Sequence, residues 1–231
     1  STYDNAGNLS PNFLQRITKY EGTRLGRQEL HAELLEDIPG ALWTRAILDD
    51  LRCAPMDVPE LQRVVVAIDP PAKSGEDADE AGIIAVGLGV DGHVYVLEDS
   101  SKQATPTEWG TEAIALYKAR SADRIVAEVN NGGEMVENTL RMIDPTVSYK
   151  AVHASRGKAI RAEPVSALYE RRLVHHVGSF ADLETQMTSF TQDFNREEAG
   201  YSPDRLDALV WAITELMIDG GEAVLENNPG V

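Results

Sequence analysis

Hydrophobic residues gather into short runs in the middle of the chain, and these runs predict strands. Residues 63–68 (RVVVAI) form a continuous, mostly β-branched run, which is typical of a central strand buried on both faces. Residues 82–89 (GIIAVGLG) and 93–98 (HVYVLE) flank residues 90–92 (VDG). An Asp-Gly pair between two such segments is a strong hairpin signal, so we expect a strand followed by a β-hairpin.

Helix and strand signals alternate after this hairpin. Thr105 and Pro106 suit the N-cap and the first position of a helix. Further strands are expected over 124–128 and 147–152, with a second helix between them. The resulting order is strand, strand, strand, helix, strand, helix, strand. It predicts an α/β fold whose mixed central sheet combines an antiparallel hairpin with parallel strands and is flanked by helices.

The two ends of the chain show a different pattern. Residues 1–60 contain amphipathic pieces over 12–20, 27–36 and 43–52, separated by turn residues and without a strand-like run. We expect a helical linker or arm over 1–60, a main domain over 61–220 and a frayed tail over 221–231. The last third of the main domain is mainly helical, with helices expected over 160–170, 181–190 and 203–219.

Composition narrows the possible classes of protein. The chain has 231 residues, with 21 Lys and Arg against 38 Asp and Glu, which gives a net charge of −17. This charge disfavours a free-standing nucleic-acid binder, but not an enzyme that holds DNA through metal ions and one local basic stretch. The single cysteine, Cys53, excludes a disulfide framework and a zinc–thiolate cluster. Without an apolar run long enough to span a membrane or a signal-peptide pattern, a cytoplasmic protein is expected.

Two carboxylates come at the ends of predicted buried strands, so a solvent-exposed, solubilising role does not explain them. Asp69 comes directly after the run over 63–68, and Glu128 ends the expected strand over 124–128. Open α/β sheets bind ligands at the carboxyl ends of their strands, so the two side chains are expected to meet there. Two carboxylates at close range repel each other, and a bound divalent cation would relieve this repulsion. Because the ligands would be oxygen atoms, Mg²⁺ or Mn²⁺ is expected rather than zinc. A turn cap is the alternative role for Asp69.

A further acidic pair opens the last expected helix. With Ser202 as N-cap and Pro203 at the first helical position, Asp204 lies in the first turn, and Asp207 follows about one turn later. The helix also carries an apolar stripe: Leu206, Leu209, Val210, Ile213, Leu216 and Met217. Packing this stripe on the sheet would bring both acids to the sheet edge. Acids in a first turn also occur for the helix dipole alone, which is the alternative.

One segment is basic within this acidic chain. Residues 150–172 hold six basic and two acidic residues, a local charge of +4. Arg156 and Lys158 are predicted to lie in a flexible loop, with Arg161 one turn beyond, which makes the three a candidate phosphate-contacting element. A solvated helix face is the alternative. Since Gly157-Lys158 is followed by Ala159, the chain has no P-loop of its own.

In combination, these motifs resemble the ribonuclease H-like fold. More closely, they resemble the C-terminal nuclease domain of a large terminase subunit, the DNA-packaging motor of tailed phages and phage-like particles. Residues 20–43 are similar to the segment that joins the motor ATPase domain to the nuclease in that family. The resemblance covers nearly the whole chain. The matching segments are AIDPP (67–71), DEAGIIAVG (79–87), AEVNNGG (127–133), RGKAIRAEPVSALYE (156–170), VHHVG (174–178) and SPDRLDALVWAITEL (202–216).

The resemblance implies an activity and a set of metal ligands. It implies a metal-dependent endodeoxyribonuclease that cuts concatemeric double-stranded DNA during genome packaging into a phage-like capsid. By motif, Asp69, Glu128 and Asp204 would be the catalytic, metal-binding triad, and Asp207 would be a further metal ligand. Two divalent ions, Mg²⁺ or Mn²⁺, would be the cofactors of phosphodiester hydrolysis.

Other residues receive supporting roles by the same resemblance. Arg156, Lys158 and Arg161 would contact DNA phosphates, and little sequence reading is expected because nothing resembles a major-groove reader. Asp79 and Asn130 match acidic and amide positions of the motifs, and would support the metal ligands. Because the chain is acidic, the metal-free domain is expected to bind duplex DNA weakly at physiological salt.

The resemblance also implies partners and a location. The partners would be double-stranded DNA, the portal protein, the small terminase subunit and the ATPase domain of the same polypeptide. That ATPase domain is expected to be missing here, so no ATPase activity is expected from this chain alone. The protein would act in the cytoplasm of the bacterial host cell, transiently at the procapsid portal, and no membrane partner is expected.

Three alternatives share parts of this pattern. A ribonuclease H-like junction resolvase would differ by junction-selective cutting and a stable dimer. A non-catalytic portal-docking domain would not need the complete set of acids. Sugar kinases and actin-like ATPases need a phosphate loop with Gly and Ser or Thr after the first strand, which residues 69–73 (DPPAK) do not supply.

Overall fold

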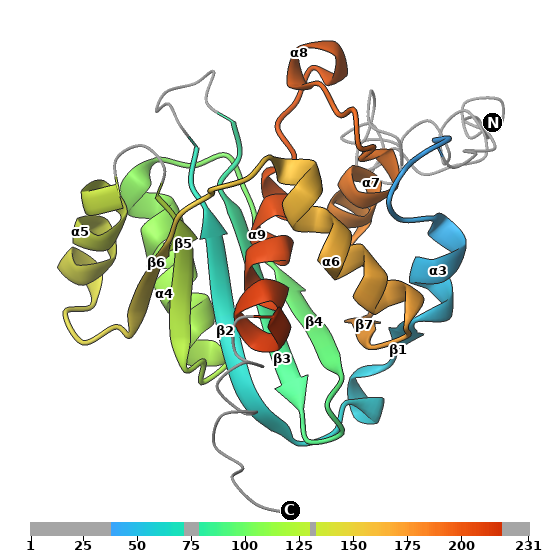
Figure 1. Cartoon of the computed structure of the whole chain (residues 1–231). Helices are drawn as coiled ribbons and strands as arrows, with labels where there is room; N and C mark the ends of the chain where they lie inside the picture. The colour runs from blue at the N-terminus through green and yellow to red at the C-terminus, as the bar shows by residue number, and fades with distance from the viewer. Residues whose placement is uncertain (1–37, 72–78, 130–132, 219–231) are drawn as a thin grey trace, which may run out of the picture.

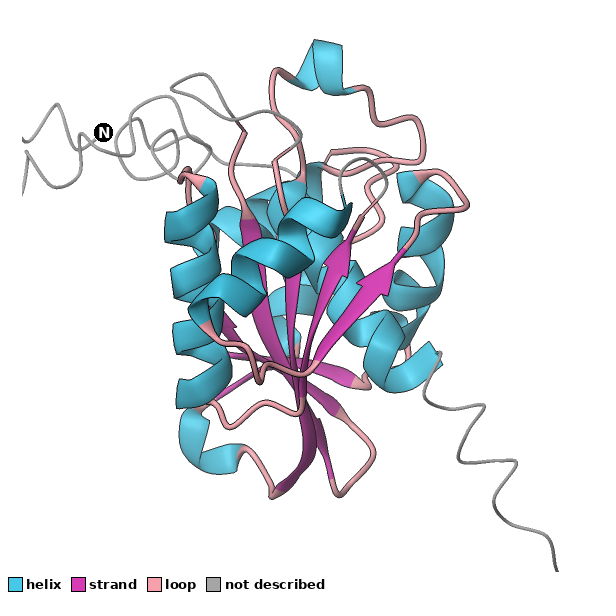
Figure 2. Ribbon diagram, turned by 90° about the vertical axis from the view of Figure 1, so that its left-hand side faces the viewer, coloured by secondary structure: helices cyan, strands magenta, loops and turns pink. Residues whose placement is uncertain are grey.

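The computed structural model describes residues 38–71, 79–129 and 133–218, and this part of the chain is built around one sheet. Seven strands of the described residues lie in the order β1-β7-β4-β3-β2-β5-β6, with helices on both faces (Figures 1 and 2). The strands are β1 (Arg52–Cys53), β2 (Leu61–Asp69), β3 (Gly82–Gly89), β4 (Val94–Asp99), β5 (Arg124–Glu128), β6 (Tyr149–Val152) and β7 (Val174–Val177). The helices are α3 (Arg45–Asp50), the 3₁₀ turn η2 (Pro55–Asp57), α4 (Pro106–Ala119), α5 (Gly133–Ile143), α6 (Lys158–Glu170), α7 (Ala181–Ser189), α8 (Arg196–Ala199), α9 (Asp204–Ile213) and the π-helical turn η3 (Thr214–Ile218). None of these helices has the length and apolar character needed to cross a membrane.

The sheet is mixed, as the sequence predicts. β2, β3 and β4 form an antiparallel meander, and Gly92 in the tight turn between β3 and β4 has a φ of +79°, which glycine adopts without strain. β5 pairs in parallel with β2, and β6 in parallel with β5. β7 and β1 extend the other edge by parallel pairing beside β4. The predicted element order from β2 to β6 and the predicted fold class are confirmed.

Residues 64–68 of the central strand β2 are buried on both faces, which explains the continuous apolar run there. Val65 and Ala67 contribute to the core under α6, α7 and α9. Val64, Val66 and Ile68 contribute to a second core, shared with α4 and α5. Because neither face of this stretch meets water, alternation of polar and apolar residues is absent from it.

The structure corrects two predictions of element boundaries. The region before residue 60 does contain a strand, since β1 pairs with β7 through Arg52↔His176 and Cys53↔Val177. A strand this short leaves no periodic pattern and forms only because a neighbour pairs with it. The last helix begins one residue later than predicted, with Pro203 rather than Ser202 as N-cap. Its predicted continuation beyond Ile213 takes the form of the π-helical turn η3. The expected helices over 12–20 and 27–36 and the tail over 221–231 lie outside the described residues.

A buried carboxylate connects α3 and β1 to the rest of the fold. Glu184 on α7 is 1% exposed and accepts hydrogen bonds from Arg45 at 2.7 Å and from Arg52 at 2.8 Å. The His176 ring nitrogen lies 3.1 Å from the same carboxylate, and the other ring nitrogen lies 2.9 Å from the Tyr169 hydroxyl. Burial would raise the pKa of Glu184, but the hydrogen bonds from His176 and Arg52 hold this pKa well below its usual value.

We expect Glu184→Gln to lower the free energy of unfolding by about 3 kcal/mol at pH 7, because it removes the charge that pairs with two arginines. A carboxylate with a lowered folded-state pKa contributes stability above its unfolded pKa of about 4.3, and loses it as the pH falls. The difference from the wild type should therefore shrink below about pH 4. Urea unfolding at pH 7, 5 and 3.5 measures it.

The matched control is Glu170→Gln, at the exposed end of α6. It should change the free energy of unfolding by less than about 0.5 kcal/mol. An equal loss in both variants, or a Glu184→Gln effect that grows as the pH falls, would contradict the role given to Glu184.

Candidate functional site

Asp69 and Glu128 lie at the same edge of the sheet. They are the last residues of β2 and β5, which are adjacent and parallel. The register pairs Ala67 with Val126 and Ile68 with Ala127, so Asp69 and Glu128 occupy the next position. The structure therefore brings together the two strand-end carboxylates that the sequence singled out.

The N-terminus of α9 lies against this edge because Gly82 has no side chain. Gly82 pairs directly with Asp69 across β2 and β3. A Cβ atom at Gly82 would lie 2.0 Å from the Asp204 carbonyl oxygen and 3.1 Å from the Ala208 Cβ. Only glycine allows so close an approach, and the approach brings Asp204 beside Asp69.

Burial and repulsion dominate the electrostatics of these carboxylates. Burial raises the pKa of Asp69 well above its usual value, and the charges of Asp207, Asp204 and Glu128 raise it further, while Lys158 opposes the rise. Burial also raises the pKa of Asp204, to about 6, and raises the pKa of Asp207. Four carboxylates from β2, β5 and α9 thus share one electrostatic environment.

Two cations from α6 partly neutralise the cluster. The Lys158 ammonium donates to Asp207. Arg161 donates to Glu128 Oε2 at 3.2 Å and to Asp207 Oδ1 at 3.2 Å. Burial would lower the pKa of Lys158, but Asp207 and Asp69 raise it above its usual value. Lys158 was expected in a flexible loop and is instead the first residue of α6, whereas Arg156 lies exposed in the preceding loop.

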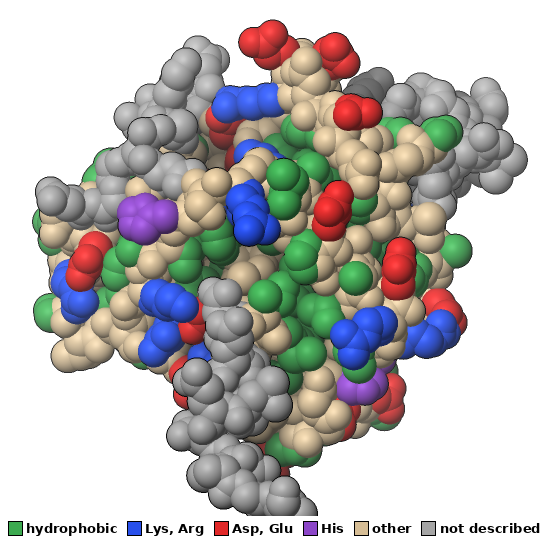
Figure 3. Space-filling model, in the orientation of Figure 1, with side chains coloured by type: hydrophobic (Ala, Val, Ile, Leu, Met, Phe, Trp, Pro, Cys, Tyr) green, Lys and Arg blue, Asp and Glu red, His purple; other side chains and the backbone are tan. Residues whose placement is uncertain are grey.

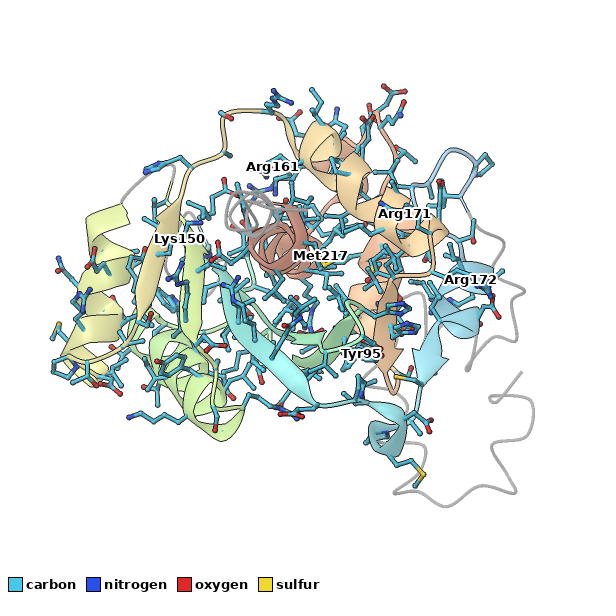
Figure 4. The ribbon with its side chains drawn as sticks, turned by 60° about the horizontal axis from the view of Figure 1, so that its bottom comes forward. Tyr95, Lys150, Arg161, Arg171, Arg172 and Met217 are labelled. Atoms are coloured by element: carbon cyan, nitrogen blue, oxygen red, sulfur yellow. The ribbon has the colours of Figure 1, made fainter. Side chains whose placement is uncertain are left out.

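Trp211 is a site residue that the sequence analysis missed. Its indole nitrogen donates to Glu128 Oε2 at 2.7 Å, and the Arg161 guanidinium carbon lies 4.7 Å from its ring centroid. Figure 4 shows Arg161 beside α9, near the start of α6. The available signal was spacing, because Trp211 follows Asp207 by four residues and therefore shares a face of the helix with it.

Arg205 is a second residue that was missed. Two of its nitrogens donate to the Glu80 carboxylate at 2.8 Å each, and a third donates to Asp99 Oδ2 at 2.8 Å. Because Glu80 precedes β3 and Asp99 ends β4, these ion pairs connect the first turn of α9 to the sheet.

The two expected supporting residues differ in what the structure describes. Asp79 forms an ion pair with Arg196, and the charge of Asp79 contributes to the raised pKa of Asp204. Asn130 lies outside the described residues.

The chemistry of this site suits a hard divalent cation. Its donors are carboxylate oxygens, which Mg²⁺ and Mn²⁺ prefer, and their mutual repulsion is the condition that such an ion relieves. Within the described residues, no three Asp, Glu, His or Cys side chains converge as a ready coordination shell. Lys158 and Arg161 contact Asp207 and Glu128 instead, and they supply the compensating charge in this conformation.

Comparison with known proteins identifies the fold. A family model described as the terminase RNaseH-like domain matches residues 66–216. The nuclease domain of the large terminase subunit of bacterial virus Sf6 aligns at 14% identity over 75% of this chain and 98% of that chain, with a TM-score of 0.57. The human cytomegalovirus terminase nuclease domain, soaked with Mn and inhibitor-bound, aligns at 16% identity over 79% and 97%, with a TM-score of 0.55.

Two further structures extend this comparison. The large terminase nuclease from a thermophilic phage aligns at 14% identity over 76% of this chain and 98% of that chain, with a TM-score of 0.55. A variant of the Sf6 domain has been solved with manganese. A comparison with curated proteins gives no match. The structural matches share the fold of this chain, and the ribonuclease H-like prediction is confirmed.

The raised pKa of Asp204 predicts a pH-dependent stability. The folded protein holds the Asp204 proton with a pKa of about 6, against about 4 in an unfolded chain. The stability that this proton contributes is complete below about pH 4 and is lost as the pH rises through about 6. In metal-free buffer, Asp204→Asn should therefore gain about 2 kcal/mol relative to the wild type between pH 4 and pH 7. Thermal unfolding in EDTA across this range measures the gain.

Asp144→Asn is the control for this prediction. Hydrogen bonds from Lys118 and Thr146 lower the pKa of Asp144 to about 2, which is the opposite direction. This variant should be less stable than the wild type, by a difference that stays constant between pH 5 and pH 7. If the difference in stability between Asp204→Asn and the wild type were also constant over this pH range, the pKa of Asp204 would not be raised in the folded protein.

Proposed function

Since the chain belongs to the family of terminase RNase H-like domains, we propose that it is a metal-dependent DNA endonuclease that cuts concatemeric double-stranded DNA during genome packaging into a phage-like capsid. The observation that carries this proposal is the placement of four carboxylates around one sheet edge. Asp69 and Glu128 end adjacent strands, and Asp204 and Asp207 lie in the first turn of α9, which packs against that edge. The repulsion among these carboxylates would destabilise the fold if their role were purely structural. A bound divalent cation would relieve it.

We assign the metal ligands to the same four carboxylates. Asp69, Glu128 and Asp204 would hold two divalent ions, Mg²⁺ or Mn²⁺, with Asp207 as a further ligand. When bound, such ions lower the pKa of a coordinated water and stabilise the charge that develops on the phosphate oxygens. The manganese in structures of the Sf6 and cytomegalovirus nuclease domains supports this assignment.

The cations of α6 and its preceding loop would bind the substrate phosphate. Lys158 and Arg161 already face the carboxylates, and Arg156 lies exposed beside them. Trp211 fixes Arg161 by stacking and Glu128 by its hydrogen bond, so both keep their orientation. Phosphate contacts of this kind position a duplex without reading its sequence.

The wider assembly is proposed on the same family grounds. The domain would act with the portal protein, the small terminase subunit and an ATPase domain of the same polypeptide, and would have no ATPase activity by itself. Its place would be the cytoplasm of the bacterial host, transiently at the procapsid portal. Asp79 and Asn130 are proposed to support the metal ligands from the surrounding residues.

Conversion of supercoiled plasmid to nicked and linear forms tests the nuclease. The purified chain should cut with Mn²⁺ or Mg²⁺ and not with EDTA. Asp69→Asn and Glu128→Gln should each reduce the rate by about 100-fold or more, because each removes charge where the transition state needs it. Asp144→Asn, which removes an equal charge far from the site, should cut at the wild-type rate.

Calorimetric titration with Mn²⁺ gives an independent readout. Heat of binding in the wild type that disappears in Asp69→Asn would support the metal site even if plasmid cutting is slow without the motor domain. A wild-type chain that neither cuts DNA nor binds Mn²⁺ would overturn the proposal in favour of a portal-docking domain. Preferential cutting of four-way junctions by a stable dimer would instead indicate a resolvase.

A further inference from the structure

Trp211 on α9 is a buried residue whose indole nitrogen donates to a carboxylate of the candidate site. It is 8% exposed, and its Nε1 donates to Glu128 Oε2 at 2.7 Å. Burial alone does not require such a bond, because Trp43 is 1% exposed and its Nε1 has no hydrogen-bond partner among the described residues. The contact between Trp211 and Glu128 is therefore a feature of the site and not a consequence of burial.

Glu128 Oε2 accepts from two donors that differ in charge and in freedom of movement. Arg161 donates at 3.2 Å and also donates to Asp207 at 3.2 Å. The bond from Trp211 is shorter, as is typical of a strong hydrogen bond to an ionised acceptor. The indole N–H is neutral and lies in a rigid ring, whereas the guanidinium ends a long side chain with many rotamers. Trp211 is thus the more firmly placed of the two donors.

Ion pairs on both sides of Trp211 fix its position against the sheet. Trp211 follows Asp207 by four residues and precedes Glu215 by four, so the three lie near one face. Asp207 pairs with Arg161 on α6. Glu215 accepts hydrogen bonds from three strand residues: Arg63 at 3.4 Å, Arg124 at 3.0 Å and Lys150 at 2.6 Å. Because Arg124 begins β5 and Glu128 ends it, the ion pair with Glu215 holds α9 to the strand that carries the indole's acceptor.

Little water reaches the hydrogen bond between Trp211 and Glu128. The side chain of Glu128 is 15% exposed and that of Arg161 is 11% exposed. Figure 3 shows hydrophobic side chains over α6 and α9 in the middle of this face, with Lys and Arg side chains around them. A hydrogen bond to a carboxylate is stronger in such surroundings than in water, so the indole restrains Glu128 effectively.

We infer that Trp211 is a positioning residue, which holds Glu128 in its metal-binding orientation and keeps it there when Arg161 turns to a substrate phosphate. This inference rests on the proposed nuclease function and names the residue on which the orientation of one metal ligand depends. A phosphate attracts the cationic Arg161 away from Glu128, whereas the neutral indole N–H is attracted far less. The Trp211 ring, 4.7 Å from the guanidinium carbon, supports Arg161 during this exchange.

The Mn²⁺ affinity of the whole chain, measured by calorimetric titration without DNA, tests this role. Trp211→Phe keeps an aromatic ring but removes the N–H, and should weaken Mn²⁺ binding about tenfold or more, because the partners of metal ligands orient them. Arg161→Gln removes the other donor to Glu128 together with a repelling cation, so its Mn²⁺ affinity should stay within about threefold of the wild type. An equal loss in the two variants would overturn the distinct role of Trp211.

Trp43→Phe is the matched control. It makes the same substitution at a buried tryptophan whose N–H has no partner among the residues that the structure describes, so the Mn²⁺ affinity should not change. Both Phe variants leave a small cavity, so both should unfold at a lower temperature than the wild type. A purely structural role of Trp211 would produce this loss of stability without a loss of Mn²⁺ affinity.

A second measurement does not depend on the folding of Trp211→Phe. The chain has three tryptophans, so its ¹⁵N–¹H spectrum should show three indole signals. Trp43→Phe and Trp109→Phe identify two of them, and the third belongs to Trp211. Saturation with diamagnetic Mg²⁺ should shift the Trp211 signal more than the other two, because the acceptor of its N–H is a proposed metal ligand. A Trp211 signal that does not move at saturating Mg²⁺ would overturn the inference.

The outcomes for Trp211 and for the nuclease are separable. If the wild type binds Mn²⁺ and cuts plasmid, and Trp211→Phe binds Mn²⁺ equally well, the positioning role falls and the nuclease stands. If the wild type neither binds Mn²⁺ nor cuts, both proposals fall. Weaker Mn²⁺ binding in Trp211→Phe than in Trp43→Phe would support the positioning role even where plasmid cutting is slow.

Discussion

The crowding of negative charge at one sheet edge is the constraint on which the rest of the structure depends. Burial raises the pKa of Asp69, Asp204 and Asp207, and the negative charges of neighbouring carboxylates raise each of these values further. A fold that keeps such a cluster must supply compensating charge and rigid support. Here, Lys158 and Arg161 supply the charge, and the close contact at Gly82 supplies the support.

Helix α9 connects the two charged regions of the sheet. It contributes Asp204 and Asp207 from its first turn, where the helix dipole favours negative charge. The turn that follows it contributes Glu215 at the other end, beneath three cations. Between these ends, its apolar residues fill the core over β2 and β3, and Arg205 fixes its start to the strand ends. A small movement of this helix would therefore disturb both regions together.

The mixed sheet tolerates large changes in sequence around this arrangement. The viral nuclease domains share only 14–16% of residues with the chain, yet align over three quarters or more of it. The core requires hydrophobic residues of suitable size on strands buried on both faces, which many sequences satisfy. The carboxylate positions are set by strand ends and a helix start, so they depend on the fold more than on neighbouring side chains.

Local pattern determined most of the fold and the candidate carboxylates. The run at 63–68, the hairpin at 90–92 and the acids after two apolar strands are features of consecutive residues, which propensity and periodicity describe. Tertiary structure alone decided the rest. β1 forms only because β7 pairs with it, and Trp211 reaches Glu128 only because α9 crosses the end of β5. Such contacts join residues far apart in the chain, and no local pattern encodes the distance between them.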